Sequence, residues 1–227
     1  MSNFSSAISK RYDELSGQEC CLSCGAALSL AKIRQGDICL DRGCGKGLDV
    51  LRMATMTGPA GHAYGIDISE GMMGVARENA LKMGLKNVSF VRSELEKISL
   101  SDNLADVLIS NCTINHSLAQ DIVWLEIARI LKPGGTVVVS DIYALDEVPA
   151  EFRNDPEAVA ECWAGAVSRV EYLKNILKSG LSSIEILEES APYEKGRIRV
   201  CSFTVRAVKP GGQARAKNCG PGCGCQG

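Results

Sequence analysis

The sequence predicts an α/β protein with a doubly wound, mostly parallel sheet, a small cap insertion and antiparallel closing strands. Short apolar runs alternate with segments of helical periodicity at intervals of roughly 20–30 residues. A glycine-rich turn follows the first run, and polar residues follow the others. Crossovers between parallel strands are right-handed, so the carboxyl ends of these strands should share one edge of the sheet, where open α/β sheets bind ligands.

Length and composition fit one globular domain with appendages. The chain has 227 residues, an apolar fraction of 45% and a net charge of −2, so no nucleic-acid partner is expected. No apolar run reaches the roughly 18 residues needed to cross a membrane, and no signal-peptide pattern opens the sequence. We therefore expect no membrane partner and a cytoplasmic location.

The first predicted strand begins at Ile38 and ends at Asp41, immediately before a glycine loop. Gly43, Gly45 and Gly47 follow at alternate positions. Glycine permits positive φ and lets a ligand approach the backbone closely. A dinucleotide site would have Gly-x-Gly-x-x-Gly, and Asp41 would repel a phosphate. The loop therefore favours a ligand with a positive charge, with a simple strand-to-helix turn as the alternative.

The remaining elements follow from periodicity and from breaker residues. The expected helices cover residues 26–33, 48–57, 70–83, 117–131 and 170–178, with short helices beginning within 147–156. The expected strands cover residues 62–67, 87–92, 105–110 and 136–140, with closing strands at 184–189 and 198–205. The sequence Lys132-Pro-Gly-Gly135 should break the helix before it.

Asp67 is the second candidate binding residue. It ends a predicted strand 20 residues after Gly47, where an acidic side chain can accept hydrogen bonds from two ribose hydroxyls. A helix cap is the alternative role, but Ser69 is the better cap for the helix that follows.

The eleven cysteines are unusual for a chain of this size. An odd number without a signal peptide argues against a disulfide framework and favours soft-metal or metalloid binding, or redox chemistry. Cys39 and Cys201 lie in predicted strands and should be core residues. Cys21-x-x-Cys24 has the spacing of a zinc half-site but no second pair. The tail, with Cys219, Cys223 and Cys225, could gather a soft ion or be a flexible end with incidental cysteines.

Five stretches together resemble the arsenite methyltransferase family of class I, Rossmann-like S-adenosylmethionine (SAM) methyltransferases. They are Asp41–Asp49, Ile109–Asn115, Lys132–Gly135, Ser140–Tyr143 and Ala160–Ala166. The resemblance runs from about Cys20 to Ser190 and implies SAM as cofactor and thiolate-bound trivalent arsenic as the methyl acceptor. On this basis we divide the chain into a cysteine-bearing segment (1–36), a SAM-binding core (37–141), a cap with closing strands (142–208) and a Cys/Gly-rich tail (209–227).

The resemblance also implies roles for individual residues. The expected cofactor-binding residues are Asp41, Gly43, Gly45, Gly47, Asp67, Ile68, Glu94, Leu95 and Asn111. Of these, Glu94 and Leu95 follow the third strand, where such enzymes recognise adenine; a solvated acidic turn is the alternative there. Cys112 and Cys162 match the family's catalytic thiols. Cys20, Cys21 and Cys24 lie where further family thiols occur, without a fixed register.

The implied chemistry suits these thiols. Trivalent arsenic is soft and thiophilic, and three sulfur ligands leave it a lone pair that can attack the sulfonium methyl group. Such an in-line displacement needs positioning and exclusion of water more than a general base. A thiol reductant is an expected partner.

Other functions stay open at this point. Arg42 stands where the family has an apolar residue, so the acceptor is less firmly predicted than the cofactor. The alternatives are a SAM methyltransferase of another metalloid or of an organic small molecule, with His116 as a possible base, and a non-catalytic thiolate metal-binding protein. An intact Asp41-to-Asp67 region argues against the last.

Overall fold

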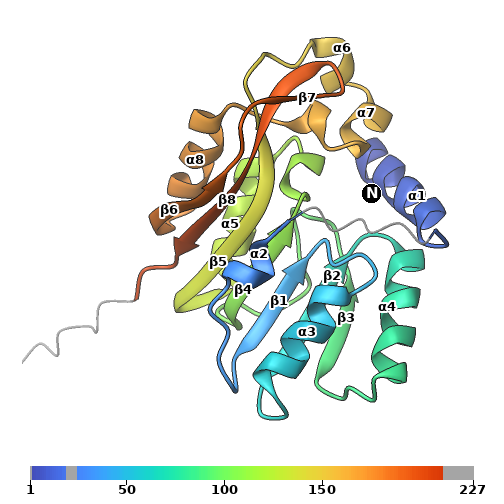
Figure 1. The fold of residues 1–227 in the computed structure, drawn as a ribbon, viewed down its shortest axis with the longest axis vertical. Helices are drawn as coiled ribbons and strands as arrows, with labels where there is room; N and C mark the ends of the chain where they lie inside the picture. The colour runs from blue at the N-terminus through green and yellow to red at the C-terminus, as the bar shows by residue number, and fades with distance from the viewer. Residues whose placement is uncertain (1, 19–24, 212–227) are drawn as a thin grey trace, which may run out of the picture.

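The computed structural model describes residues 2–18 and 25–211 and confirms the expected fold class. One sheet has the strand order β3-β2-β1-β4-β5-β8-β6, with β7 paired to β8 (Figure 1). Strands β1 to β5 are parallel, and β8 runs antiparallel to β5, β6 and β7. The strands are β1 (Ile38–Arg42), β2 (His62–Asp67), β3 (Val88–Arg92), β4 (Ala105–Asn111), β5 (Leu131–Ala144), β6 (Ser182–Glu189), β7 (Tyr193–Lys195) and β8 (Ile198–Val208).

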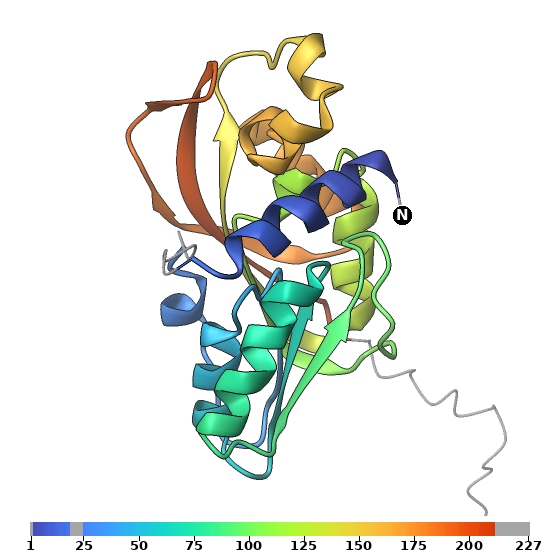
Figure 2. The same cartoon turned by 90° about the vertical axis from the view of Figure 1, so that its right-hand side faces the viewer.

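Helices cover both faces of the sheet. Figure 2 shows α3 and α4 on one face and α5 with α8 on the other. Side chains alternate along β1 accordingly, since Leu40 joins the core cluster of α5 and α8 while Cys39 joins that of α3. The helices are α1 (Asn3–Leu15), α2 (Ala27–Leu30), α3 (Leu48–Thr57), α4 (Glu70–Lys82), α5 (Gln120–Ile130), α6 (Ala150–Arg153), α7 (Pro156–Ala160) and α8 (Arg169–Lys178), with 3₁₀ turns η1 (Ile114–His116) and η2 (Trp163–Gly165).

A separate small core lies above the sheet edge. Residues between β5 and α8 form α6, α7 and η2, which enclose their own apolar cluster with Ile142, Trp163 and Val200 (Figure 1). Helix α1 lies against α7 and α4. Within the described residues, no helix combines the length and apolarity required to cross a membrane.

The structure corrects three expectations about local elements. Lys132-Pro-Gly-Gly135 breaks the preceding helix as expected, since α5 ends at Ile130, but the strand after it starts at Leu131 rather than at residue 136. Gly134 and Gly135 exchange backbone hydrogen bonds with Lys209, just beyond β8, which extends the strand. Helix α5 starts at Gln120 rather than at residue 117, because residues 114–116 form η1. The N-terminal helix α1, capped by the Ser2 side chain, was not predicted at all.

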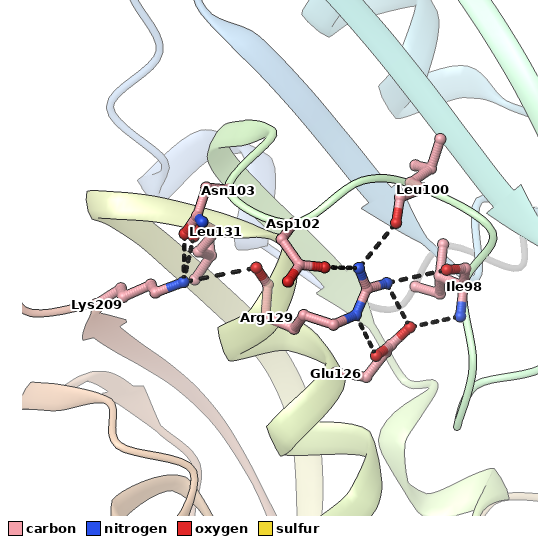
Figure 3. Close-up of polar contacts among 8 residues, drawn as sticks. All are labelled: Ile98, Leu100, Asp102, Asn103, Glu126, Arg129, Leu131 and Lys209. Carbon is pink, nitrogen blue, oxygen red and sulfur yellow. Dashed lines mark hydrogen bonds and ion pairs between the residues drawn. The ribbon is translucent and has the colours of Figure 1, made fainter.

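Two arginines of the core have opposite environments. The Arg129 guanidinium donates to both carboxylate oxygens of Glu126, to Asp102 and to the carbonyls of Ile98 and Leu100 (Figure 3). Arg42 is fully buried, and only its Nη1 has a partner among the described residues, the Val123 carbonyl at 3.1 Å. Burial lowers the Arg42 pKa to about 10. An unpaired buried cation is costly to the folded state.

We expect Arg42→Met to raise the free energy of unfolding by about 1–3 kcal/mol, because an apolar side chain of similar length removes the cost of the unpaired cation. Urea denaturation measures this change. Arg129→Met is the matched control and should lower stability, since it leaves the half-buried Glu126 carboxylate without its cation. A clear loss of stability in Arg42→Met would show that the guanidinium is compensated after all.

Candidate active site

A cavity of about 300 Å³ lies at the carboxyl edge of β1, β2 and β4. Predicted site residues that line it are Asp41, Gly43, Gly45, Asp67, Ile68, Leu95, Asn111 and Cys112. Gly47, Glu94 and Cys162 are absent from its lining among the described residues. The parallel register explains the gathering, since Asp41 pairs with Gly65 and Ile109 and all three strands end just beyond.

The glycine loop forms one wall of this cavity. Gly43 has φ +74, and a Cβ atom there would lie 2.3 Å from Oγ1 of Thr113. Gly45 has φ +49, and a Cβ atom there would meet nothing within 4 Å, on the cavity side. Its N–H donates to Oδ2 of Asp67 at 2.8 Å. A ligand can therefore approach the Gly45 backbone closely, which a side chain would prevent.

Three carboxylates surround the loop. Burial raises the pKa of Asp41 well above its usual value, and the nearby Asp49 and Asp67 raise it further. Burial also raises the Asp67 pKa, although the backbone N–H groups of Ser69 and Gly45 hydrogen-bond its charged form. Lys46 lines the same cavity but donates to the Gln18 carbonyl. Crowded carboxylates of this kind are stabilised by a cationic ligand, so the cavity fits a cofactor with an amine and a sulfonium.

Two further residues clarify the cofactor contacts. The Ser69 side chain caps α4 by accepting from Met72, as expected, while Asp67 Oδ1 accepts from the Ser69 N–H. The backbone of Glu94 forms an isolated antiparallel β-bridge with that of Lys97. Glu96 lines the cavity, and its side chain accepts a hydrogen bond from the Ser117 hydroxyl. Sequence reasoning missed Glu96, although a second acidic residue in the same turn was visible. The adenine role of Glu94 stays a prediction.

Helix α1 supplies cavity residues that the sequence did not reveal. Phe4, Ile8 and Tyr12, spaced four residues apart, all line the cavity. The Tyr12 hydroxyl lies 3.0 Å from Nε2 of His116, and Nδ1 of His116 lies 3.1 Å from the Val159 carbonyl. Since a carbonyl only accepts, Nδ1 carries the hydrogen and Nε2 accepts from Tyr12. Both nitrogens of His116 are thus engaged, and burial lowers its pKa to about 4.

Cys112 lies directly after β4 and faces two cavities. It lines the first cavity and a second one of about 630 Å³ that also contacts Asp141, Lys195 and Glu188. Its N–H donates to the Ser140 carbonyl at 2.8 Å, and its φ is +51. No other described residue lines both cavities.

Cys162 lies in the turn between α7 and η2 and is 5% exposed. Its Sγ is 3.8 Å from Oδ1 of Asp141. Burial raises the pKa of the Cys162 thiol well above its usual value, as do Asp141 and Cys112 nearby. The φ of Cys162 is +77, so both predicted catalytic thiols occupy the left-handed region, which non-glycine residues rarely adopt. Such strain concentrates at functional sites.

The remaining predicted thiols belong to other parts of the chain. Cys20, Cys21 and Cys24, and the tail cysteines Cys219, Cys223 and Cys225, lie outside the described residues. Across residues 2–18 and 25–211, no cluster of three or more His, Cys, Asp or Glu side chains could hold a metal ion. The described part of the chain therefore contains two of the predicted thiols, Cys112 and Cys162, and Cys44 of the glycine loop also lines the first cavity.

Comparison with known proteins agrees with this geometry. The family described as "Methyltransferase domain" matches residues 33–189. An arsenite methyltransferase of Halobacterium salinarum is 35% identical over 179 residues, covering 78% of this chain and 46% of that protein. The human arsenite methyltransferase is 30% identical over 197 residues, covering 79% and 52%. The chain thus spans about half the length of these curated relatives.

A solved structure is also similar. The crystal structure of an arsenic(III) S-adenosylmethionine methyltransferase from Chlamydomonas reinhardtii superimposes with a TM-score of 0.74 at 28% sequence identity. The match covers 91% of this chain and 75% of that one.

We expect Asp41→Asn to weaken SAM binding about 10- to 100-fold, because it removes the carboxylate whose charged form a cationic ligand would favour while keeping the side-chain shape. Isothermal titration calorimetry measures the affinity. Asp146→Asn, which breaks an ion pair with Arg199 far from the cavity, is the control. Equal affinities for the two variants would refute the electrostatic role of Asp41.

His116 should make the fold sensitive to acid. Its folded pKa of about 4 is below the ordinary 6.5, so between these values the unfolded chain binds a proton that the folded chain does not. Stability is then lost as the pH falls through this window, by up to about 3 kcal/mol. Urea denaturation from pH 7 to pH 4 should show a smaller loss for His116→Gln. Parallel pH curves for both proteins would contradict this assignment.

Proposed function

Because this chain belongs to the methyltransferase domain family and has the class I SAM methyltransferase fold, we propose that it transfers a methyl group from SAM to thiolate-bound trivalent arsenic. The observation that supports the acceptor best is Cys112, a strained thiol that lines both the carboxylate-rich cavity and the second cavity. The arsenite methyltransferases among its relatives support the same acceptor.

The proposal assigns the first cavity to the cofactor. When bound, SAM supplies an activated methyl group on a positively charged sulfur. Asp67 would accept from the ribose hydroxyls, the Gly43–Gly47 backbone would approach the amino-acid part, and Asp41 would offset positive charge. Leu95 and Glu94, with Glu96 beside them, would contact the adenine. Asn111 joins this wall through a 3.2 Å hydrogen bond to Asp49.

The thiols would hold the acceptor. Arsenite would exchange hydroxyl ligands for the sulfurs of Cys112 and Cys162, with each thiol proton leaving with a hydroxyl as water. Arsenic would keep an electron pair that can attack the methyl group. A third thiol is proposed from Cys20, Cys21 or Cys24, and a thiol reductant would keep all of them reduced, as a cytoplasmic location would favour.

The surroundings suit a displacement that needs no general base. His116 already shares hydrogen bonds through both ring nitrogens. The walls contributed by Phe4, Ile8 and Leu118 are apolar, which limits water near the reacting atoms. Positioning of the acceptor is therefore the main contribution required from the protein.

The test is a product assay. Purified protein is incubated with SAM, arsenite and a thiol reductant, and mass spectrometry then separates arsenic species and S-adenosylhomocysteine. Methylated arsenic with matching S-adenosylhomocysteine supports the proposal. SAM binding without methylated arsenic would keep the cofactor and exclude arsenite, leaving selenium, tellurium or organic acceptors to be assayed.

We expect Cys112→Ser and Cys162→Ser each to lower methylation of arsenite at least 10²-fold while SAM affinity changes less than twofold, because a hydroxyl is a poor ligand for a soft element. Cys201→Ser is the control: this thiol is buried in β8, lines neither cavity and should keep activity in the folded fraction. Full activity in both cysteine variants would refute the thiolate mechanism.

A further inference from the structure

One buried amide connects the two segments that carry the predicted catalytic thiols. Asn115 lies three residues after Cys112 and is completely buried. Its Nδ2 donates to Oδ1 of Asp141 at 2.9 Å and to the Ile142 carbonyl at 2.7 Å. Its Oδ1 accepts from Nε2 of Gln120 at 2.9 Å. Both donor hydrogens and the acceptor oxygen of the amide are therefore used.

The Gln120 amide links Asn115 to the cap. Gln120 Nε2 also donates to the Gly165 carbonyl at 3.0 Å, three residues after Cys162. Gly165 lies so close that a Cβ atom there would be 1.9 Å from the Asn115 carbonyl oxygen. The turn carrying Cys162 is thus fixed directly against the turn carrying Cys112.

Asp141 completes the connection. Its Oδ1 accepts from Asn115 Nδ2, from the Ile142 N–H at 2.8 Å and from Cys162 Sγ, and its Oδ2 accepts from the Ile114 N–H at 3.1 Å. Asn115 and the Cys162 thiol therefore share one carboxylate oxygen. Asp141 also lines the second cavity, beside Cys112.

Apolar packing alone would not define this arrangement. The cap has its own core cluster, which is separate from the two clusters of the sheet, and apolar contacts are not directional. The Asn115 amide uses both donor hydrogens and its oxygen, although Gln120 Oε1 has no partner among the described residues. Directional buried contacts of this kind help to specify one arrangement. The relative position of the two thiols therefore depends on the Asn115 contacts.

We propose that Asn115 is a positioning residue, which holds the Cys162 thiol opposite Cys112 so that the two form a preorganised pair for the acceptor. This inference rests on the proposed function, because the acceptor it invokes is trivalent arsenic. Partners that orient ligating groups typically contribute 10- to 100-fold to affinity. Preorganisation acts by lowering the entropy lost when both thiols bind one atom.

The test compares arsenite binding in the full chain and in Asn115→Ala, followed by ultraviolet absorbance of the arsenic–sulfur bonds. The part of the absorbance change that is lost in Cys162→Ser reports arsenite bound at the Cys162 thiol. We expect Asn115→Ala to weaken this binding 10- to 100-fold. SAM affinity and the alkylation rate of the partly exposed Cys112 should change less than twofold. In turnover, the KM for arsenite should rise more than kcat falls.

Asn175→Ala is the matched control, since Asn175 is also buried but lies in α8, on neither thiol-bearing segment. Unchanged arsenite affinity in Asn115→Ala overturns the inference. A joint loss of arsenite and SAM affinity that Asn175→Ala reproduces also overturns it, because the effect is then general destabilisation. If Asn115→Ala does not fold, the same comparison of arsenite and SAM affinities is made with Gln120→Ala, since Gln120 contacts Asn115 and Gly165.

The proposed function and this inference fail in different measurements. A wild-type chain that binds arsenite but makes no methylated arsenic refutes the function, while the variant-to-wild-type ratio of affinities still judges Asn115. A wild-type chain that methylates arsenite, with Asn115→Ala binding equally well, refutes the inference alone. A wild-type chain that binds no arsenite refutes the proposed function. The inference about Asn115 is refuted with it, because there is then no acceptor for the thiols to hold.

Discussion

The parallel pairing of β1 through β5 determines where the groups at the strand ends of the candidate site lie. Because these strands run in one direction, their carboxyl ends share an edge, and the residues that follow them are brought together from distant parts of the chain. Asp41 lies near the carboxyl end of β1, Asp67 is the last residue of β2, and Cys112 comes directly after β4. The antiparallel β8 then returns along β5 and closes the second cavity on the other side of Cys112. A single choice of strand direction thus supplies both the carboxylate-rich cavity and its neighbour.

Local polar contacts fix the positions of the two thiols more closely than strand direction does. Backbone alone would leave Cys112 and Cys162 on separate turns of separate cores, yet both residues adopt left-handed φ values and both turns meet at Asn115 and Gly165. The conformational cost at the two cysteines is offset by hydrogen bonds that their own segments form with β5 and α5. Arg42 shows the opposite case, because its buried charge has no comparable set of partners among the described residues. The Asn115 amide is more completely hydrogen-bonded than Arg42, although Gln120 Oε1 in the same network has no partner among the described residues.

Features encoded over short stretches of sequence could be predicted, and features created by distant contacts could not. The alternation of strands and helices, the glycine loop after Asp41 and the Ser69 cap are local, and the structure has them where the sequence indicated. Helix α1 was missed although Phe4, Ile8 and Tyr12 have helical spacing, because most residues between them are polar and the stripe packs on a cavity built by later residues. Glu96 was missed because its place in the cavity wall, where it accepts a hydrogen bond from Ser117, depends on a contact 21 residues away in the sequence. The roles of Cys112 and Cys162 were predicted from the family resemblance. The residues next to them in the sequence gave no indication of their strained backbone.

The two cavities have only Cys112 in common among the described residues, and otherwise different residues line them. Residues of α1 line the cavity proposed for the cofactor, and residues of β8 line the other. In the proposed reaction, spent cofactor could leave and fresh cofactor enter without passing the cavity from which arsenic arrives. For arsenic that stays on its thiols, a second methyl transfer would require the thiol reductant to supply two electrons first, because each transfer uses the lone pair of arsenic.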